Sequence, residues 1–223
     1  MNFLSHYYHE LPSDDPYYIC GVVFPDILSN FSKRHGQKIR LHPDKILTTQ
    51  DIKSESLKRG VQQHYFVDGF FHDSDYFNEY TGAVDELINK LGFSAIHRRQ
   101  FAFSHVFLEI MMDRCLLVQD ITIADSLYAA LDKVDLGILD RFLSTNTKLE
   151  NTQPLTEHFD HFRTLKFIYH YADSNRFTGI MNSINQSLGN PPFTNEDNQQ
   201  MRILINDMEQ ILLKATFPNF VND

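Results

Sequence analysis

The sequence is poor in residues that cross-link a chain or anchor it in a membrane. Its 223 residues include two cysteines, no tryptophan and no apolar run near the length of a membrane span. Cys20 and Cys115 lack the spacing of a metal knuckle and are too few for a disulfide framework, so we expect buried thiols in a reducing compartment. No signal-peptide pattern is present. These absences predict a cytoplasmic protein with no membrane partner.

Positive charge is also scarce. The chain has 20 lysines and arginines against 29 aspartates and glutamates, which gives a formal net charge of −9. Because nucleic-acid binding depends mainly on contacts between basic residues and phosphates, this charge disfavours a nucleic-acid partner. The chain is rich instead in aromatic residues and histidine, with 19 phenylalanines, 10 tyrosines and 11 histidines. The aromatic residues predict a sizeable core, whereas the histidines need a chemical explanation.

The hydrophobic pattern is helical. Apolar and polar residues nowhere alternate between turn dipeptides, so we expect few strands or none. The segment 33–53 is polar and basic and contains a glycine and a proline, which predicts a long surface loop. Three- and four-residue apolar spacing, with capping residues, predicts helices elsewhere. These helices are 17–31, 54–73, 75–91 (ended by Gly92), 97–119, 122–134, 135–143, 156–171 (capped by Thr156) and a last one after Thr194. The sequence therefore predicts one all-α domain over residues 1–223.

The sharpest chemical feature is a stripe of imidazole, carboxylate and imidazole. His64, Asp68 and His72 are four residues apart, which places them on one face of a helix. His105 and Glu109 repeat the spacing in the segment 97–119. Two such helices facing each other can close a site for Mn, Fe, Zn or Ni. The simpler alternative is that each pair forms only a surface hydrogen bond or complements the charge of a helix end.

Two further candidates precede this stripe. His6 lies close to the start of the sequence, where a histidine is usually solvated. Asp26 follows Pro25, where an aspartate is usually a helix N-cap or a surface charge. Outside this region, His158 and His161 are three residues apart, and we interpret them as an exposed helix face.

Three short segments, taken in order, resemble a known family. They are Met1-Asn-Phe-Leu-Ser-His6, Gly21-Val-Val-Phe-Pro-Asp26 and Gly60-Val-Gln-Gln-His64-Tyr-Phe-Val-Asp68. They are similar to the MNFLAH, GNLLAD and GIxxHRxID segments of the acyl carrier protein phosphodiesterase family, whose members resemble metal-dependent HD phosphohydrolases. The motifs lie within residues 1–120, and the rest of the chain matches in helical character alone. The resemblance implies a helix bundle of the HD-phosphohydrolase type.

The resemblance also implies an activity. The family uses a divalent metal, typically manganese, to hydrolyse the phosphodiester that joins 4′-phosphopantetheine to holo acyl carrier protein. Acyl carrier proteins are acidic, so the partner surface should be locally basic. The basic residues available for it include Lys33, Arg34, Lys38, Arg40, Arg98 and Arg99. The implied metal ligands are His6, Asp26, His64, Asp68 and His105. The implied supporting or general-base groups, which are the catalytic candidates, are His72 and Glu109.

The chain departs from the family pattern at several positions. Tyr65 replaces the arginine that follows the motif histidine, which removes a phosphate-binding cation. His72 replaces an aspartate, and His105, Glu109 and Ile110 stand where the family has an Asp-x-x-x-Asp-His run. These exchanges keep metal-binding chemistry but leave two alternatives open. One is a metal-dependent hydrolase of a nucleotide or small phosphodiester, and the other is a non-catalytic helical module that keeps the fold.

Overall fold

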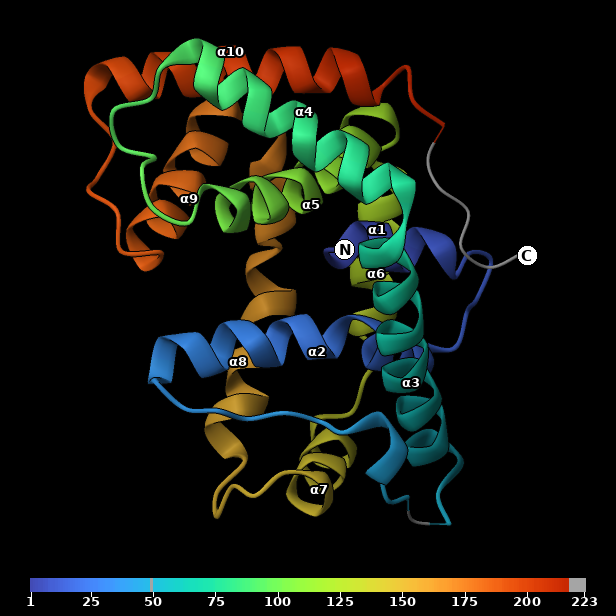
Figure 1. Cartoon of the computed structure of the whole chain (residues 1–223). Helices are drawn as coiled ribbons and strands as arrows, with labels where there is room; N and C mark the ends of the chain where they lie inside the picture. Colours follow the sequence, from blue (N-terminus) through green and yellow to red (C-terminus); the bar gives the residue numbers. More distant parts are fainter. Residues whose placement is uncertain (49, 217–223) are drawn as a thin grey trace. The chain divides into compact units, whose positions relative to one another are not determined.

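The computed structural model describes residues 1–48 and 50–216, and within these ranges the chain is helical with no strand, which confirms the all-α prediction (Figure 1). The α-helices are α1 (Phe3–His9), α2 (Pro16–His35), α3 (Ile52–Asp73), α4 (Asp75–Leu91), α5 (Gln100–Gln119), α6 (Thr122–Leu131), α7 (Leu136–Asn146), α8 (Gln153–Leu165), α9 (Ser174–Ser187) and α10 (Asn195–Leu212). Short 3-10 helices, η1 and η2, cover Pro43–Lys45 and Phe167–Ala172.

The chain divides into two compact units. The α2 unit comprises Asn2–Gly69 and Thr122–Phe167, and the α5 unit comprises Met1, Phe70–Ile121 and the described part of Ile168–Asp223. Each unit is therefore assembled from segments that are far apart in the sequence. The last turn of α3 belongs to the α5 unit and the rest of that helix to the α2 unit.

In the α2 unit, α2 is the central helix and packs against α1, α6 and α8. The Asp15 carboxylate begins it by accepting hydrogen bonds from the backbone N–H groups of Tyr17 and Tyr18 at 3.0 and 3.2 Å. Gly36 ends it in the left-handed conformation, with φ of 62°. Its buried apolar side chains include Ile19, Val22, Val23, Phe24, Ile27 and Leu28. Residues 19–25 are all buried, so every side of the helix there needs a neighbour.

Two glycines set the closest approach between α2 and α3. A Cβ atom added to Gly60 would lie 2.8 Å from Gly21 Cα and would overlap the Tyr18 carbonyl oxygen. A Cβ atom added to Gly21 would overlap the Leu57 carbonyl oxygen. Both positions therefore require glycine, and the backbone contact that they allow brings the next residues of both helices together.

The α5 unit is built around the largely buried helix α5, which packs against α4, α9 and α10. The hydroxyl of Ser104 on α5 donates to Asp85 of α4 at 2.6 Å. Gly92 ends α4 in the left-handed conformation, as the sequence predicts. Thr194 begins α10 in a capping box with Asp197, also as predicted, and the same carboxylate accepts a hydrogen bond from the backbone N–H of Ser94 at 2.7 Å.

Several sequence-based boundaries are wrong. The helix predicted over 156–171 is α8, which begins at Gln153, so Thr156 lies inside it and is not the cap. After Leu165 the chain continues as the 3-10 helix η2. Helices α1 and α9 were not predicted. Neither helix has a strong apolar period. Helix α1 is only seven residues long, and α9 has few buried residues among many polar ones.

The predicted surface loop over 33–53 is a loop only in part. Helix α2 extends to His35, and η1 covers part of the rest of the segment. Leu41 and Ile46 are buried, so these two apolar side chains hold the segment against the unit. Thr49 lies outside the described residues.

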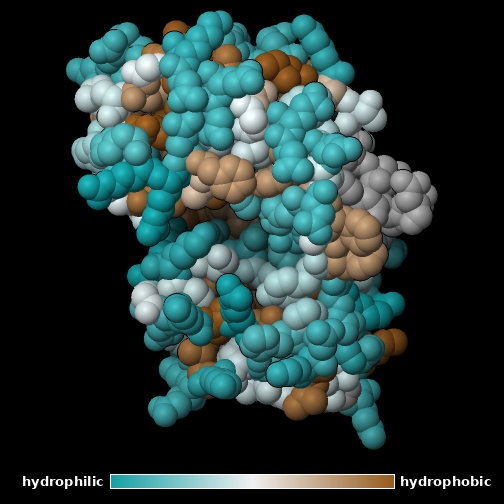
Figure 2. All heavy atoms as spheres, in the orientation of Figure 1, coloured by the Kyte–Doolittle hydropathy of each residue, from teal (hydrophilic) through white to brown (hydrophobic). Residues whose placement is uncertain are grey.

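The remaining surface and core features agree with the composition. Cys20 and Cys115 are buried free thiols. Within residues 1–48 and 50–216, no helix is both long and apolar enough to cross a membrane. Hydrophilic residues cover most of the face shown in Figure 2, with small apolar patches between them.

Candidate metal centres

The α2 unit brings together two imidazoles and a carboxylate. His6 of α1, Asp26 of α2 and His64 of α3 each present one ligand atom, and these atoms all lie within 4.8 Å of one another. We call this set the α2-unit group. Two neutral imidazoles and a carboxylate on three different helices form a recurring arrangement for binding a divalent transition metal.

His6 is buried deeply, with 1% of its surface exposed. Burial, followed by the charge of His64, lowers the pKa of His6 well below its usual value, so the ring is neutral at neutral pH. Among the described residues, no hydrogen-bond partner reaches its Nε2. A buried ring nitrogen without a partner is costly, and metal coordination would satisfy it. The expectation that a histidine near the start of the sequence is solvated is wrong here.

His64 is held in the orientation that a metal ligand needs. Its Nδ1 donates to the backbone carbonyl of Val22 at 2.8 Å, and its ring stacks on His6 with 4.0 Å between centroids. Because Nδ1 carries the proton, the lone pair of the neutral ring is on Nε2. A backbone carbonyl that fixes the tautomer in this way commonly supports histidines that bind metals.

The two aspartates near this group differ in position. Asp26 lies inside α2, directly after Pro25, and is half-buried, so it is neither an N-cap nor a surface charge. Asp68 is one turn beyond His64 on α3, and its Oδ1 lies 3.8 Å from His6 Nε2. With 29% of its side chain exposed, Asp68 stands at the edge of the α2-unit group and not among its three converging atoms.

The pKa of Tyr65 is affected by charged residues near the α2-unit group. Burial raises the pKa of Tyr65, the positive charge of Arg40 opposes this rise, and the carboxylates of Asp26 and Asp68 add to it. Arg40, an exposed residue of the segment after α2, therefore lies within electrostatic range of the tyrosine and supplies a cation to this region. The sequence pattern gave no reason to connect Arg40 with Tyr65.

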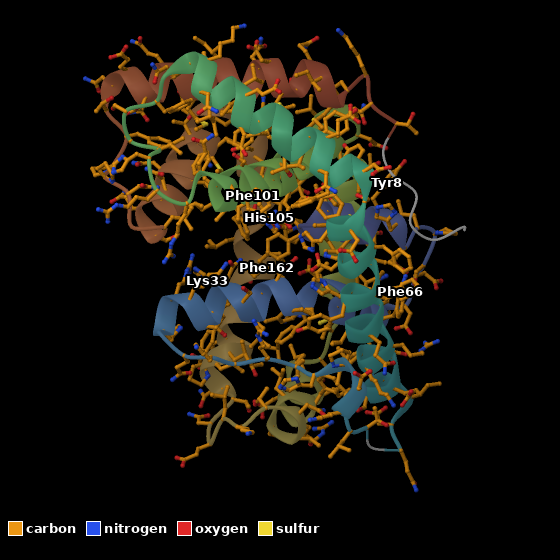
Figure 3. All side chains as sticks on the ribbon, viewed as in Figure 1. Tyr8, Lys33, Phe66, Phe101, His105 and Phe162 are labelled. Carbon is orange, nitrogen blue, oxygen red and sulfur yellow. The ribbon has the colours of Figure 1, made fainter. Side chains whose placement is uncertain are left out.

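The α5 unit contains a second group of the same composition. His72, at the end of α3, and His105 and Glu109, one turn apart on α5, present three ligand atoms that lie close together. His72 Nε2 lies 2.9 Å from His105 Nε2, and Glu109 Oε1 lies 3.3 and 3.0 Å from these two nitrogens. We call this set the α5-unit group. His105 and its neighbour Phe101 are labelled in Figure 3.

Glu109 is the anionic member of the α5-unit group, and 15% of its side chain is exposed. Burial by itself would raise the pKa of Glu109. The Met1 amino group, 3.0 Å from Oε1, and the hydrogen bonds from His105 and His72 outweigh this effect and hold the pKa well below its usual range. The carboxylate is therefore ionised over the whole physiological pH range.

The candidate residues predicted from the sequence thus fall into two groups, a division that the sequence did not indicate. His6, Asp26 and His64 converge as expected, with Asp68 beside them. His105, expected as a ligand of the same site, is instead grouped with His72 and Glu109, which were expected as supporting or general-base groups. The four-residue spacing of His105 and Glu109 was the available signal for this second group, but spacing does not identify the partner on another helix.

Comparison of the chain with protein-family models, with curated proteins and with solved structures finds no match to any of them.

Proposed function

We propose that this protein is a metal-dependent phosphodiester hydrolase whose active centre is the α2-unit group. The convergence of His6, Asp26 and His64 from three helices is the observation on which the proposal rests. The resemblance of the same segments to the acyl carrier protein phosphodiesterase family supplies the reaction class. The buried free thiols of Cys20 and Cys115 support a cytoplasmic location for it.

The residues fit a divalent cation. His6 and His64 would bind it through neutral imidazole nitrogens and Asp26 through a carboxylate oxygen, and the partnerless buried Nε2 of His6 supports this assignment. The family resemblance favours manganese, while this donor set also suits iron, zinc or nickel. When bound, such an ion lowers the pKa of water and neutralises charge that develops on the phosphoryl oxygens.

The chain itself supplies a base and a cation near the group. Asp68, partly exposed beside His6, would accept the proton of the attacking water. Arg40 offers a positive charge near Tyr65, where the family pattern has an arginine within the motif. A guanidinium there would pair with a phosphate oxygen of the substrate, so Arg40 compensates for the loss of the motif arginine.

The proposed substrate is holo acyl carrier protein, from which the enzyme would release 4′-phosphopantetheine. The C-terminal end of α2 and the segment after it expose the basic residues Lys33, Arg34, Lys38 and Arg40 (Figure 3 labels Lys33). An acidic carrier protein would be attracted to this basic cluster in spite of the net charge of −9.

The direct test is incubation of the protein with holo acyl carrier protein and Mn²⁺, followed by mass spectrometry of the carrier protein. We expect loss of the prosthetic group, and a decrease of about 100-fold or more in rate for His64→Ala. Asp68→Asn should lower kcat by about 100-fold or more while the metal content is unchanged. His161→Ala, a change at an exposed position of the same unit, is the matched control and should retain full activity. No release with any of several divalent ions would reject the carrier-protein assignment.

The second candidate function is hydrolysis of a small phosphodiester or nucleotide. Tyr65 favours it, because the motif offers a phenol where a carrier-protein hydrolase would have an arginine. Cleavage of a chromogenic phosphodiester without cleavage of holo carrier protein would select it. In both cases Arg40→Ala should raise KM more than it lowers kcat, because Arg40 is proposed to bind the substrate phosphate.

A further inference from the structure

We infer that the α5-unit group, His72, His105 and Glu109, is a second metal site that prefers zinc to manganese. This inference concerns the α5 unit and does not depend on the proposed hydrolase activity. It rests on three contacts between ligand atoms, on the donor types and on the aromatic rings that pack against the two imidazoles.

Hydrogen bonding cannot satisfy the three contacts at once. The three atoms are two imidazole Nε2 atoms and one carboxylate oxygen, at mutual distances of 2.9, 3.0 and 3.3 Å. If both Nε2 atoms carry protons, both can donate to Glu109, but their protons then oppose each other across the 2.9 Å contact. If only one Nε2 is protonated, a single N–H must serve two acceptors. A cation, by contrast, accepts lone pairs from all three atoms.

The distances also have the right size for a metal site. Zinc binds histidine nitrogen at about 2.1 Å, so two ligands separated by octahedral to tetrahedral angles lie about 3.0–3.4 Å apart. The observed distances of 3.0 and 3.3 Å fall in this range, and the third, 2.9 Å, lies just below it. His105 and Glu109 are held at this separation by the single helical turn between them.

Aromatic rings hold the two imidazoles in place. The ring of Phe77 packs edge-on against both His72 and His105, with centroid distances of 5.0 and 4.9 Å. Phe101 approaches His105 from the preceding turn of α5, at 6.3 Å. The side chains of His72 and His105 remain 29% exposed, so an ion can enter from solvent. A site with fixed ligands and one open side is suited to a fourth ligand from solvent or substrate.

The donor set determines the preferred ion. Two imidazoles and one carboxylate bind zinc more strongly than manganese, which follows the order of affinity of divalent metals for such sites. The α5-unit group has no second carboxylate among its members that would favour a harder ion. We therefore expect the α5-unit group to take Zn²⁺ from an equimolar mixture with Mn²⁺.

The experiment uses a full-length Asp26→Ala/His64→Ala variant, in which the α2-unit group is dismantled. It is incubated with equimolar Zn²⁺ and Mn²⁺, passed through gel filtration and analysed for metal by mass spectrometry. We expect about one Zn²⁺ per chain, and loss of that ion when His105→Ala or Glu109→Gln is added. His97→Ala, an exposed histidine of the same unit, is the matched control and should leave the zinc content unchanged.

Three outcomes would overturn the inference: no bound zinc, zinc that persists after both ligand substitutions, or manganese in place of zinc. If the starting variant does not fold, as judged by circular dichroism, the comparison is made between the wild type and Glu109→Gln. The wild type should then bind one more Zn²⁺ than Glu109→Gln, and equal zinc contents would overturn the inference. Because the readout is metal content, failure of the hydrolase assay does not affect this test.

Discussion

Histidine has several roles in this chain because its two ring nitrogens can act independently. His64 donates from Nδ1 to a backbone carbonyl and directs Nε2 elsewhere. His35 donates from Nδ1 to the Phe31 carbonyl at 2.9 Å and stacks on the Phe31 ring, which completes the end of α2. The high histidine content therefore combines ligand candidates with helix-end and packing roles.

His158, which we expected on an exposed helix face, is half-buried, and it provides a prediction about pH. Burial, followed by the charge of Arg34, lowers the pKa of His158 to about 4. Its ring packs edge-on against Phe31, and His35 and His161 add further positive charge when protonated. In the unfolded chain His158 binds a proton near pH 6.5, whereas in the folded chain it does so only near pH 4. As the pH falls from about 6.5 to about 4, the unfolded state therefore binds the proton first, and the stabilisation of the folded state by neutral His158 is lost.

His158→Phe keeps an aromatic ring and removes the titration. Because the ring is only half-buried, solvent screening reduces the effect, and this variant should lose about 1 kcal/mol less unfolding free energy than the wild type between neutral pH and about pH 5. Urea unfolding at the two pH values measures the difference. An identical pH dependence in both proteins would show that burial of His158 does not perturb its titration.

At the residue scale, the sequence predicted which side chains are candidate metal ligands better than it predicted which of them lie together. The spacing of His64 and Asp68 and the family resemblance selected His64, which converges with His6 and Asp26, and Asp68, which lies beside them. Spacing along a helix fixes the face on which a residue lies, but it contains no information on which helix faces it. For that reason the sequence did not indicate that His105 lies with His72 and Glu109.

At the scale of helices, the α2-unit group depends on two positions without side chains. Gly21 and Gly60 let the backbones of α2 and α3 touch. Asp26 follows Gly21 and His64 follows Gly60 by about one turn, so both ligands are carried to the same end of the helix contact. Pro25, which lacks the N–H that would bond the Gly21 carbonyl, lies in the same turn.

Gly60→Ala tests this contact. The added Cβ would meet backbone atoms of α2, which cannot move aside without separating the helices. We expect a loss of about 2–3 kcal/mol in unfolding free energy, measured by urea denaturation. The matched control is Gly69→Ala in the same helix, where a Cβ meets nothing within 4 Å. The control should gain about 0.5–1 kcal/mol from helix propensity, and similar effects of the two substitutions would contradict the proposed contact.

Helix ends that carry their own signal were predicted well. Gly92 and the capping box of Thr194 act through local hydrogen bonds and backbone conformation, so a short sequence window is enough to identify them. Helix α1 has no side-chain cap and depends on packing within its unit. Helix α9 does carry a start signal that was missed, because the Asp173 carboxylate accepts hydrogen bonds from the backbone N–H groups of Asn175 and Arg176 at 2.8 and 2.9 Å. The start of α8 was misplaced because Pro154, in the first turn of the helix, is a stronger helix-start residue than Thr156.

For the whole molecule, bound metal should contribute to stability. An ion that binds the folded chain alone stabilises it by about 3 kcal/mol when its concentration is 100 times its dissociation constant. For a chain of this length, we expect removal of metal by a chelator to lower Tm by roughly 5–10 °C. Differential scanning calorimetry measures the shift, and return of Tm on addition of Mn²⁺ or Zn²⁺ is the control. A Tm that neither chelator nor metal changes would favour the non-catalytic helical module.

The most direct test of the α2-unit metal centre is anomalous diffraction from crystals of the protein loaded with Mn²⁺. Data collected at the manganese absorption edge should give a peak within coordination distance of His6, Asp26 and His64. Crystals of His64→Ala, prepared in the same way, should lose this peak. A wild-type map with no peak at these three residues would contradict the proposed metal centre.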